Sequence, residues 1–144
     1  MVESAVKTKV VEKKKDLRSF LDSEGLTEAY ASGNATKIKD IDLSFNSITN
    51  PGGLDLFPNI KSLLLDHNNI SSLKDFPICV ELVTLSLSFN KIDNLEQTLM
   101  CVSDKFPSLK HLNLMKNPIN PMFNKDTSKY EKFRCIIKVW MPFL

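Results

Sequence analysis

The side chains that could support catalysis are few, and their positions keep them apart. Nucleophilic catalysis needs a base within hydrogen-bond reach of the nucleophile. The two histidines, His67 and His111, belong to segments expected to form strands roughly 10 Å apart, with ~16 Å more along the strand direction. They can share neither a metal ion nor a substrate atom, and each is expected to be a surface histidine. The four glycines form no phosphate-binding loop, so the sequence predicts a protein that is not an enzyme.

Three carboxylates lie close enough in the expected sheet to be considered together. Asp40 and Asp42 share one strand face, and Asp66 falls on the next strand. Clustered carboxylates can bind calcium or act as a general acid and base. These three project from strands without a glycine-kinked loop that could wrap an ion. The sequence therefore favours an acidic interaction patch, and it predicts no metal, no cofactor and no small-molecule substrate.

The three cysteines, Cys79, Cys101 and Cys135, are odd in number. They offer neither a disulfide framework nor the paired CxxC spacing of a zinc site. We therefore expect free thiols and a reducing compartment.

Composition indicates one globular domain. The chain has 144 residues, of which 42% are hydrophobic and 25% charged, and a formal net charge of +2. This is enough for a core that needs no disulfides. The first residues contain no signal-peptide core, and no window approaches the ~18 apolar residues of a membrane span. The expected location is the cytoplasm, with the nucleus as the alternative.

Four segments of the chain repeat the pattern LxxLxLxxNxL. They read IKDIDLSFNSI from Ile38, IKSLLLDHNNI from Ile60, LVTLSLSFNKI from Leu82 and LKHLNLMKNPI from Leu109. Their asparagines follow one another at intervals of 22, 22 and 27 residues. Repeats of 20–50 residues are typical of solenoids, in which neighbouring units bury a continuous core.

Each type of residue in the pattern has a physical role. Side chains alternate along a strand, so the LxL pair is expected to point into the core from a short parallel strand. These pairs are Ile41/Leu43, Leu63/Leu65, Leu85/Leu87 and Leu112/Leu114. After the strand the buried backbone needs new partners, and an asparagine side chain can both donate and accept hydrogen bonds. We predict a structural asparagine ladder of Asn46, Asn68, Asn90 and Asn117.

The segments between the strands are expected to form the side of the solenoid opposite the sheet. Phe57, Phe76 and Phe106 each precede a proline and the next strand, and we expect them to form a second buried stack. In the longer last interval, apolar residues recur at i, i+4, i+7 and i+11 from Leu95 to Phe106, which predicts an α-helix.

Both flanks resemble caps over the open ends of the stack, which a solenoid needs for solubility. Residues 1–36 are assigned to an N-terminal cap, with one or two short helices between residues 6 and 31. Residues 38–120 hold the four repeats, and residues 121–144 form a C-terminal cap. There, Ser128-Lys-Tyr-Glu131 predicts a capping box that opens a helix over 129–139, before Pro142. Its expected apolar face is Tyr130, Phe133, Ile136, Ile137 and Trp140.

The outward positions of the strands are the candidate binding site. Apolar residues at such positions have no role in the core, and aromatic or methionine side chains in a polar surround mark recognition surfaces. For Phe45 and Phe89 the alternative is that they fold back over the loops as core residues. The candidate partner-binding residues are Asp40, Asp42, Phe45, Leu64, Asp66, His67, Ser86, Phe89, His111, Asn113 and Met115.

Charge is distributed unevenly along the chain. Residues 1–15 carry +3, residues 16–104 carry −7 and residues 105–144 carry +6. The acidic middle favours a basic partner and faster association with it. The basic ends could attract RNA or an anionic membrane, but KTKVVEKKK lacks interleaved aromatics and the closing lysines sit on a helix with one face buried. We favour a solvated charged face at both ends, with no direct nucleic-acid binding.

From residue 38 onward the chain resembles the short intracellular leucine-rich repeat proteins closed by a leucine-rich repeat cap, of the phosphatase-regulator-like class with 22-residue repeats. The long final repeat, residues 87–117, and the sequence YEKFRCIIKVWMP, with its Arg134-Cys135 pair, most closely resemble the leucine-rich melanocyte differentiation-associated family. The spliceosomal U2 A′ type shares the tyrosine-led helix that ends at a proline but lacks the Arg-Cys pair.

The repeats and this resemblance imply an α/β fold: a right-handed leucine-rich repeat solenoid with a short parallel concave sheet and helical caps at both ends. The resemblance also implies a non-enzymatic adaptor that binds a protein partner through the concave face, such as a Rab-type small GTPase or a trafficking complex. The alternative is a ribonucleoprotein scaffold of the U2 A′ type that binds an RNA-binding protein in the nucleus.

Overall fold

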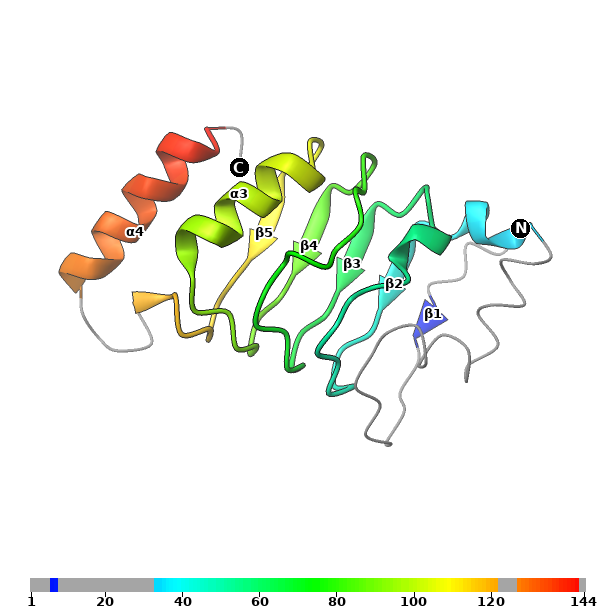
Figure 1. Ribbon diagram of the computed structural model, residues 1–144, viewed down its shortest axis with the longest axis horizontal. Helices are drawn as coiled ribbons and strands as arrows, with labels where there is room; N and C mark the ends of the chain where they lie inside the picture. Colours follow the sequence, from blue (N-terminus) through cyan, green and yellow to red (C-terminus); the bar gives the residue numbers. More distant parts are fainter. Residues whose placement is uncertain (1–5, 8–32, 122–126, 143–144) are drawn as a thin grey trace.

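The computed structural model describes residues 6–7, 33–121 and 127–142. Short parallel strands alternate with turns and one longer crossover helix, and a last helix follows them (Figure 1). The elements are β1 Val6–Lys7, η1 Asn34–Lys37, β2 Asp40–Asp42, η2 Leu54–Leu56, β3 Ser62–Leu64, β4 Thr84–Ser86, α3 Leu95–Lys105, β5 His111–Asn113 and α4 Thr127–Trp140.

The strands form one parallel sheet in chain order, β1-β2-β3-β4-β5. Ile41 of β2 pairs with Leu63 of β3, Leu63 with Leu85, and Leu85 with Leu112. Equivalent positions of successive repeats therefore lie side by side, as the repeat pattern predicts. A parallel sheet built from consecutive units is the expected solenoid architecture.

One strand was not expected. Val6 pairs with Ile41 and Lys7 with Asp42, so β1 extends the sheet beyond the first repeat. At these two residues the expectation of a helix is wrong, because the open edge of β2 offers unpaired backbone groups that a parallel strand satisfies. The rest of the expected N-terminal helical cap, residues 8–32, lies outside the described residues.

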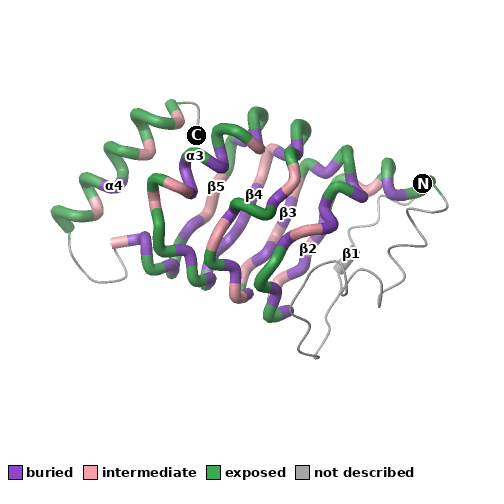
Figure 2. The backbone as a smooth tube through the Cα atoms, in the orientation of Figure 1, coloured by how far each residue is buried: buried purple, intermediate pink, exposed green. Residues whose placement is uncertain are grey.

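The inward side chains of the strands form the core, as predicted. Ile41, Leu63 and Leu85 are at most 3% exposed, and Leu112 is half-buried at the last strand. Figure 2 shows the same alternation of buried and less buried positions along the strands. The predicted second stack is also buried, and the rings of Phe76 and Phe106 meet edge to face at 5.6 Å.

The helix predicted in the last crossover is present as α3. Its buried side chains include Cys101 and Val102, which belong to the same core as the inward side chains of the strands. Asn94 caps it, because the Asn94 Oδ1 accepts a hydrogen bond from the Gln97 N–H at 2.9 Å. The strand positions that point away from the core therefore form the face opposite α3.

The last helix, α4, lies at the end of the stack (Figure 1). Phe133 joins the core, and Tyr130 and Ile137 pack against it. α4 begins at Thr127, so Ser128 lies inside the helix and the predicted capping box is wrong, because an N-cap residue must have non-helical dihedral angles.

Two residues of the expected apolar face of α4 do not pack. Ile136 and Trp140 are exposed, because Tyr130, Phe133 and Ile137, spaced i, i+3 and i+7, already form the stripe that reaches the core. Among the described residues, no helix is both long and apolar enough to cross a membrane.

Candidate protein-binding face

The asparagine ladder fixes the backbone at the point where each strand ends. Asn90 Nδ2 donates to the carbonyl oxygen of Leu87 in its own repeat at 3.1 Å and to that of Leu65 in the preceding repeat at 2.9 Å. Its Oδ1 accepts from the Ile70 N–H at 2.9 Å. One buried side chain thus joins two repeats through both its donor and its acceptor. The other three ladder asparagines are also buried.

The first ladder residue differs from the others. Asn46 Nδ2 donates to the carbonyl oxygens of Leu43 and Ser44 at 2.9 and 3.0 Å. Its buried Oδ1 has no hydrogen-bond partner among the residues that the structure describes. In later repeats this acceptor takes an N–H from the unit before, as Asn68 Oδ1 does from Ile48 at 2.8 Å.

The residue before each ladder asparagine adopts a left-handed backbone conformation. Phe45, His67, Phe89 and Lys116 have φ between 54° and 64°. This conformation is uncommon for residues other than glycine and marks a constrained turn. Hydrogen bonds between repeats hold this conformation. The N–H groups of Phe45, His67 and Phe89 each donate to a carbonyl oxygen of the next repeat, at residues 66, 88 and 115 respectively, over 2.9 to 3.0 Å.

This backbone geometry stacks three rings on the surface. The Phe45 and His67 ring centroids are 4.2 Å apart with planes 12° apart, and those of His67 and Phe89 are 4.1 Å apart with planes 13° apart. Phe45 is 66% exposed and Phe89 47%. We name Phe45, His67 and Phe89 the ring stack. The two phenylalanines therefore do not fold back into the core.

Acidic and polar side chains cover the strands next to the ring stack. Asp66 Oδ1 accepts hydrogen bonds from the Ser86 hydroxyl at 2.6 Å and the Ser88 N–H at 2.8 Å. Asp42 Oδ1 accepts from the Ser44 N–H at 3.0 Å. These contacts fix two carboxylates in place, while Asp40 is exposed at the start of β2.

An open hollow of about 480 Å³ continues this surface across β3, β4 and β5. Half-buried Leu64 lines it, with exposed His111 and half-buried Asn113 on the far side. Ser86 lies at its floor, buried, and accepts a hydrogen bond from Asn113 Nδ2 at 3.1 Å. Met115, 60% exposed, follows β5. All the candidate partner-binding residues thus belong to one sheet face and its rim.

Phe45, His67 and Phe89 belong to the candidate binding face predicted from the sequence, but the stacking of their rings is not part of that prediction. The signal was present in the sequence. Phe45, His67 and Phe89 occupy the same position, directly before the ladder asparagine, in three consecutive repeats. Parallel strands about 4.8 Å apart bring such residues close to ring-stacking distance.

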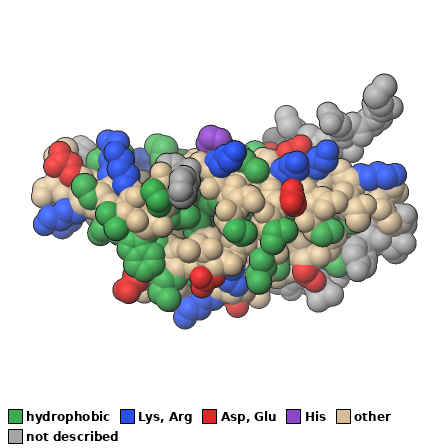
Figure 3. All heavy atoms as spheres, turned by 90° about the horizontal axis from the view of Figure 1, so that it is seen from above, with side chains coloured by type: hydrophobic (Ala, Val, Ile, Leu, Met, Phe, Trp, Pro, Cys, Tyr) green, Lys and Arg blue, Asp and Glu red, His purple; other side chains and the backbone are tan. Residues whose placement is uncertain are grey.

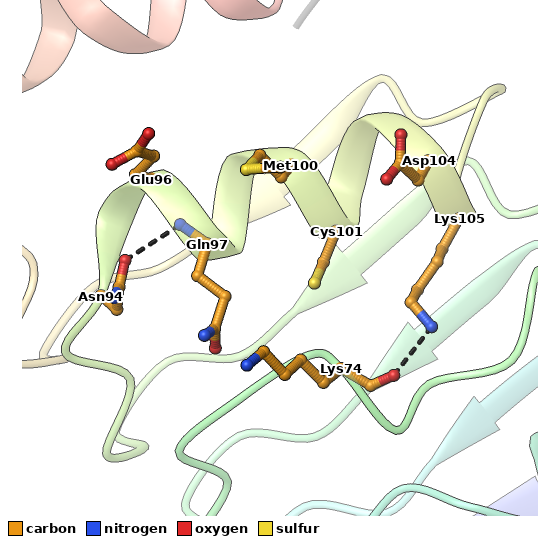
Figure 4. A pocket seen from close by; sticks show the side chains of 8 residues that line it. All are labelled: Lys74, Asn94, Glu96, Gln97, Met100, Cys101, Asp104 and Lys105. Atoms are coloured by element: carbon orange, nitrogen blue, oxygen red, sulfur yellow. Dashed lines mark hydrogen bonds between the residues drawn. The ribbon is translucent and has the colours of Figure 1, made fainter.

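A second hollow, of about 370 Å³, lies beside α3, between this helix and the segment that carries Lys74 (Figure 4). Two of its lining residues hold the backbone: Asn94 caps α3, and the Lys105 ammonium donates to the carbonyl oxygens of Lys74 and Phe76. Within the described ranges, no group of three or more His, Cys, Asp or Glu side chains is arranged to hold a metal ion.

The cysteines of the described residues carry free thiols. Cys79 and Cys101 are buried, and Cys135 is exposed on α4. Burial raises the pKa of the Cys79 thiol to about 11, against the lowering effect of the nearby Lys105 amine. A thiol with so high a pKa is not poised as a nucleophile.

Comparisons with known proteins agree with the geometry of the repeats. The family described as Leucine Rich repeat matches residues 34–57 and 107–121. The structure is similar to a chain in the crystal structure of the Drosophila melanogaster SNF/U2A′ complex, with a TM-score of 0.54, 21% identity, and coverage of 93% of this chain and 64% of that one. The fold is a leucine-rich repeat solenoid.

A second similar structure is human 5T4, also called Wnt-activated inhibitory factor 1 or trophoblast glycoprotein. Its TM-score is 0.51 at 19% identity, and the match covers 67% of this chain and 36% of that one. The chain thus spans less than two thirds of the length of either leucine-rich repeat structure. No curated protein sequence matches it significantly. A leucine-rich repeat solenoid presents an extended concave surface of the kind that binds proteins.

Proposed function

We propose that the chain is a non-enzymatic adaptor that binds a protein partner through the ring stack and the adjoining strand surface. The observation that carries this proposal is the ring stack. Three aromatic side chains lie in van der Waals contact on the surface, two of them about half exposed or more, on a backbone held in the left-handed region. Solvent-exposed aromatic anchors on a rigid support are typical of binding hot spots.

The chemistry of the face favours a partner segment that carries basic residues. Asp40 and Asp42 lie on β2 and Asp66 follows β3, and residues 16–104 carry a charge of −7. A guanidinium group can stack on the exposed end of Phe45 while it pairs with a carboxylate. The face across β2 to β5 is about 15 Å wide, which fits one helix or one pair of loops of a partner. An interface of ~800 Å² would occupy most of it.

For the cellular role we propose an adaptor linked to a small GTPase of the Rab type or to a membrane-traffic complex, in the cytoplasm. The support is the resemblance of the final repeat and of the Arg134-Cys135 pair to the leucine-rich melanocyte differentiation-associated family. The alternative is a nuclear ribonucleoprotein scaffold. The fold shared with a chain of the SNF/U2A′ complex and the tyrosine-led last helix support it.

The test is an affinity pull-down, read by mass spectrometry, with the intact chain and a variant that lacks two rings of the stack. Phe45→Asn and Phe89→Asn remove the rings at φ values of 64° and 54°, where asparagine is better tolerated than phenylalanine. The matched control is Lys116→Asn, the same backbone position in the fourth repeat, outside the ring stack. Circular dichroism must show that all three proteins fold.

We expect a specific partner to be lost from the double variant and kept by Lys116→Asn, and its association to slow as salt is raised. A small GTPase or trafficking subunit among the lost partners supports the first cellular role, and splicing components support the alternative. Identical partners for all three proteins would move the binding site away from the ring stack.

A further inference from the structure

The helix α4 carries a second apolar stripe that the core does not use. Phe133 is 8% exposed and belongs to the core. Ile136, Val139 and Trp140 are 42%, 79% and 46% exposed. These three large hydrophobic side chains form an exposed apolar patch on one helix, and such patches typically mark interaction sites.

Basic side chains share this stripe. With 3.6 residues per turn, positions 129, 132, 136, 139 and 140 fall on one side of the helix. Lys129 and Lys132 are exposed there, about two turns and one turn before Ile136. The whole of α4 holds four basic residues and one acidic residue, Glu131. The outer side of α4 therefore combines aliphatic, indole and ammonium groups.

The position of α4 leaves this stripe accessible to a flat surface. α4 is the last element at one end of the stack (Figure 1), and hydrophobic and Lys or Arg side chains lie together on that end of the molecule (Figure 3). Residues 105–144 carry +6, whereas residues 16–104 carry −7. The charge separation along the solenoid would turn the basic end toward a negatively charged surface.

From these observations we infer that the outer stripe of α4 binds the surface of an anionic lipid bilayer. A helix with lysines beside Trp and aliphatic residues inserts the apolar groups at the boundary of the headgroups, while the lysines meet the anionic lipids. The stripe holds one aromatic ring, Trp140, beside two aliphatic side chains, so it lacks the series of rings on which successive nucleic-acid bases stack. The stripe runs along one helix at the end of the stack, and such a convex surface suits a planar ligand. This inference differs from the solvated charged face expected from the sequence, and the experiment below distinguishes the two.

The chain supplies its own reporter for the test. Trp140 is the only tryptophan and lies in the stripe. The intact chain is mixed with phosphatidylcholine vesicles that contain phosphatidylserine, and with vesicles of phosphatidylcholine alone. We expect co-sedimentation and a blue shift of tryptophan emission with the anionic vesicles, quenching of that emission by brominated lipid, and much weaker binding to the neutral vesicles.

Two variants assign the binding to the stripe. Val139→Glu replaces a 79% exposed side chain and should weaken vesicle binding by about tenfold or more, since it removes an inserted group and adds a like charge. Its control is Ile78→Glu, at a 70% exposed aliphatic residue in the turn before β4. Lys132→Glu should weaken binding roughly tenfold, and Lys91→Glu, exposed in a turn of the solenoid, should leave it unchanged.

Several results would overturn the inference. Absence of binding to the anionic vesicles rejects it, and so does equal binding to both kinds of vesicle. Equal loss of binding in Val139→Glu and Ile78→Glu would place the contact elsewhere. A blue shift induced by polyglutamate but not by vesicles would indicate an acidic protein partner. A shift that grows with protein concentration in the absence of lipid would indicate a second copy of the chain. None of these results bears on the ring stack, which lies on other elements.

Discussion

At the scale of single residues, the asparagine ladder ties each repeat to its neighbour, and its members are not equivalent. Asn90 bridges two repeats through Nδ2 and Oδ1, whereas the Oδ1 of Asn46 has no partner among the described residues. Removal of a side chain that satisfies several buried backbone groups leaves each of them without a partner, and that penalty exceeds the value of one hydrogen bond. The loss in free energy of unfolding caused by removing a ladder asparagine should therefore depend on its position in the stack.

We expect Asn90→Ala to lower the free energy of unfolding by about 2–4 kcal/mol and Asn46→Ala by about 1 kcal/mol. The measurement is urea unfolding followed by circular dichroism. Asn46→Ala serves as the matched control, because it removes the same amide from the same position of another repeat. Equal losses in the two variants would show that the bonds between repeats contribute nothing beyond those within a repeat.

The thiols give a second prediction at this scale. Near pH 8, iodoacetamide should modify Cys135 rapidly and leave Cys79 and Cys101 unmodified in the native protein, because only Cys135 is exposed. An unfolded Cys79 ionises near its ordinary pKa of 9.0, while the native thiol keeps its proton up to about 11. The contribution of Cys79 to stability is thus constant below pH 9 and falls as the pH rises from 9 to 11.

Peptide mass mapping of the labelled protein checks the first part of this prediction, and unfolding of the protein and of Cys79→Ala over the alkaline range checks the second. Labelling of Cys79 at the rate of Cys135 would contradict the burial. The same alkaline loss of stability in Cys79→Ala would assign that loss to another group.

At the scale of elements, hydrogen bonds from Lys105 add to the packing that holds α3 against the preceding repeat. The Lys105 ammonium donates to the carbonyl oxygens of Lys74, at 2.8 Å, and of Phe76. Lys105→Met keeps the length and the apolar stem but removes the charged donor. We expect it to lower the free energy of unfolding by about 1–3 kcal/mol, while Lys91→Met, at an exposed turn, changes it little. Chemical denaturation of both variants is the measurement, and equal values would reject the role of Lys105.

The elements also show what the sequence can and cannot predict. The inward leucines, the ladder asparagines and α3 follow from local periodicity, so the strands and the helix could be placed from the residues alone. β1 has no such pattern: Val6 and Lys7 form a strand only because β2 offers an edge. The start of α4 and the exposure of Trp140 depend equally on tertiary packing.

The candidate binding face could be predicted in outline and not in detail. Outward positions follow from strand alternation, which placed Leu64 and Asp66 on the face. The ring stack depends on a left-handed backbone that brings His67 between two phenylalanines, and local propensity for phenylalanine disfavours that conformation. The hydrogen bonds between repeats override this propensity.

At the scale of the whole molecule, each repeat of a solenoid is stabilised mainly by its immediate neighbours. A destabilising substitution at one end should therefore affect the nearest repeats most and the distant ones least. Phe133 is the buried residue of α4. We expect Phe133→Ala to lower the free energy of unfolding by about 2–4 kcal/mol. Hydrogen exchange should speed up most in β5 and least in β2, whereas Val139→Ala, at an exposed position of the same helix, should change neither. Uniform acceleration over all strands would show that the stack unfolds as one unit.

The Asn46 acceptor, which has no partner in the part of the chain that the structure describes, also suggests how such a chain could change in length during evolution. Each ladder amide takes an N–H from the unit before it, so the chemistry at every junction is the same except at the first. A duplicated 22-residue segment placed before β2 would supply a donor that Asn46 does not find among the described residues, and it would present its own asparagine to the segment before it. Adding a repeat at this end would thus not increase the number of buried polar groups without a partner. The number of repeats could therefore vary easily in evolution, and longer forms could be engineered by the same addition.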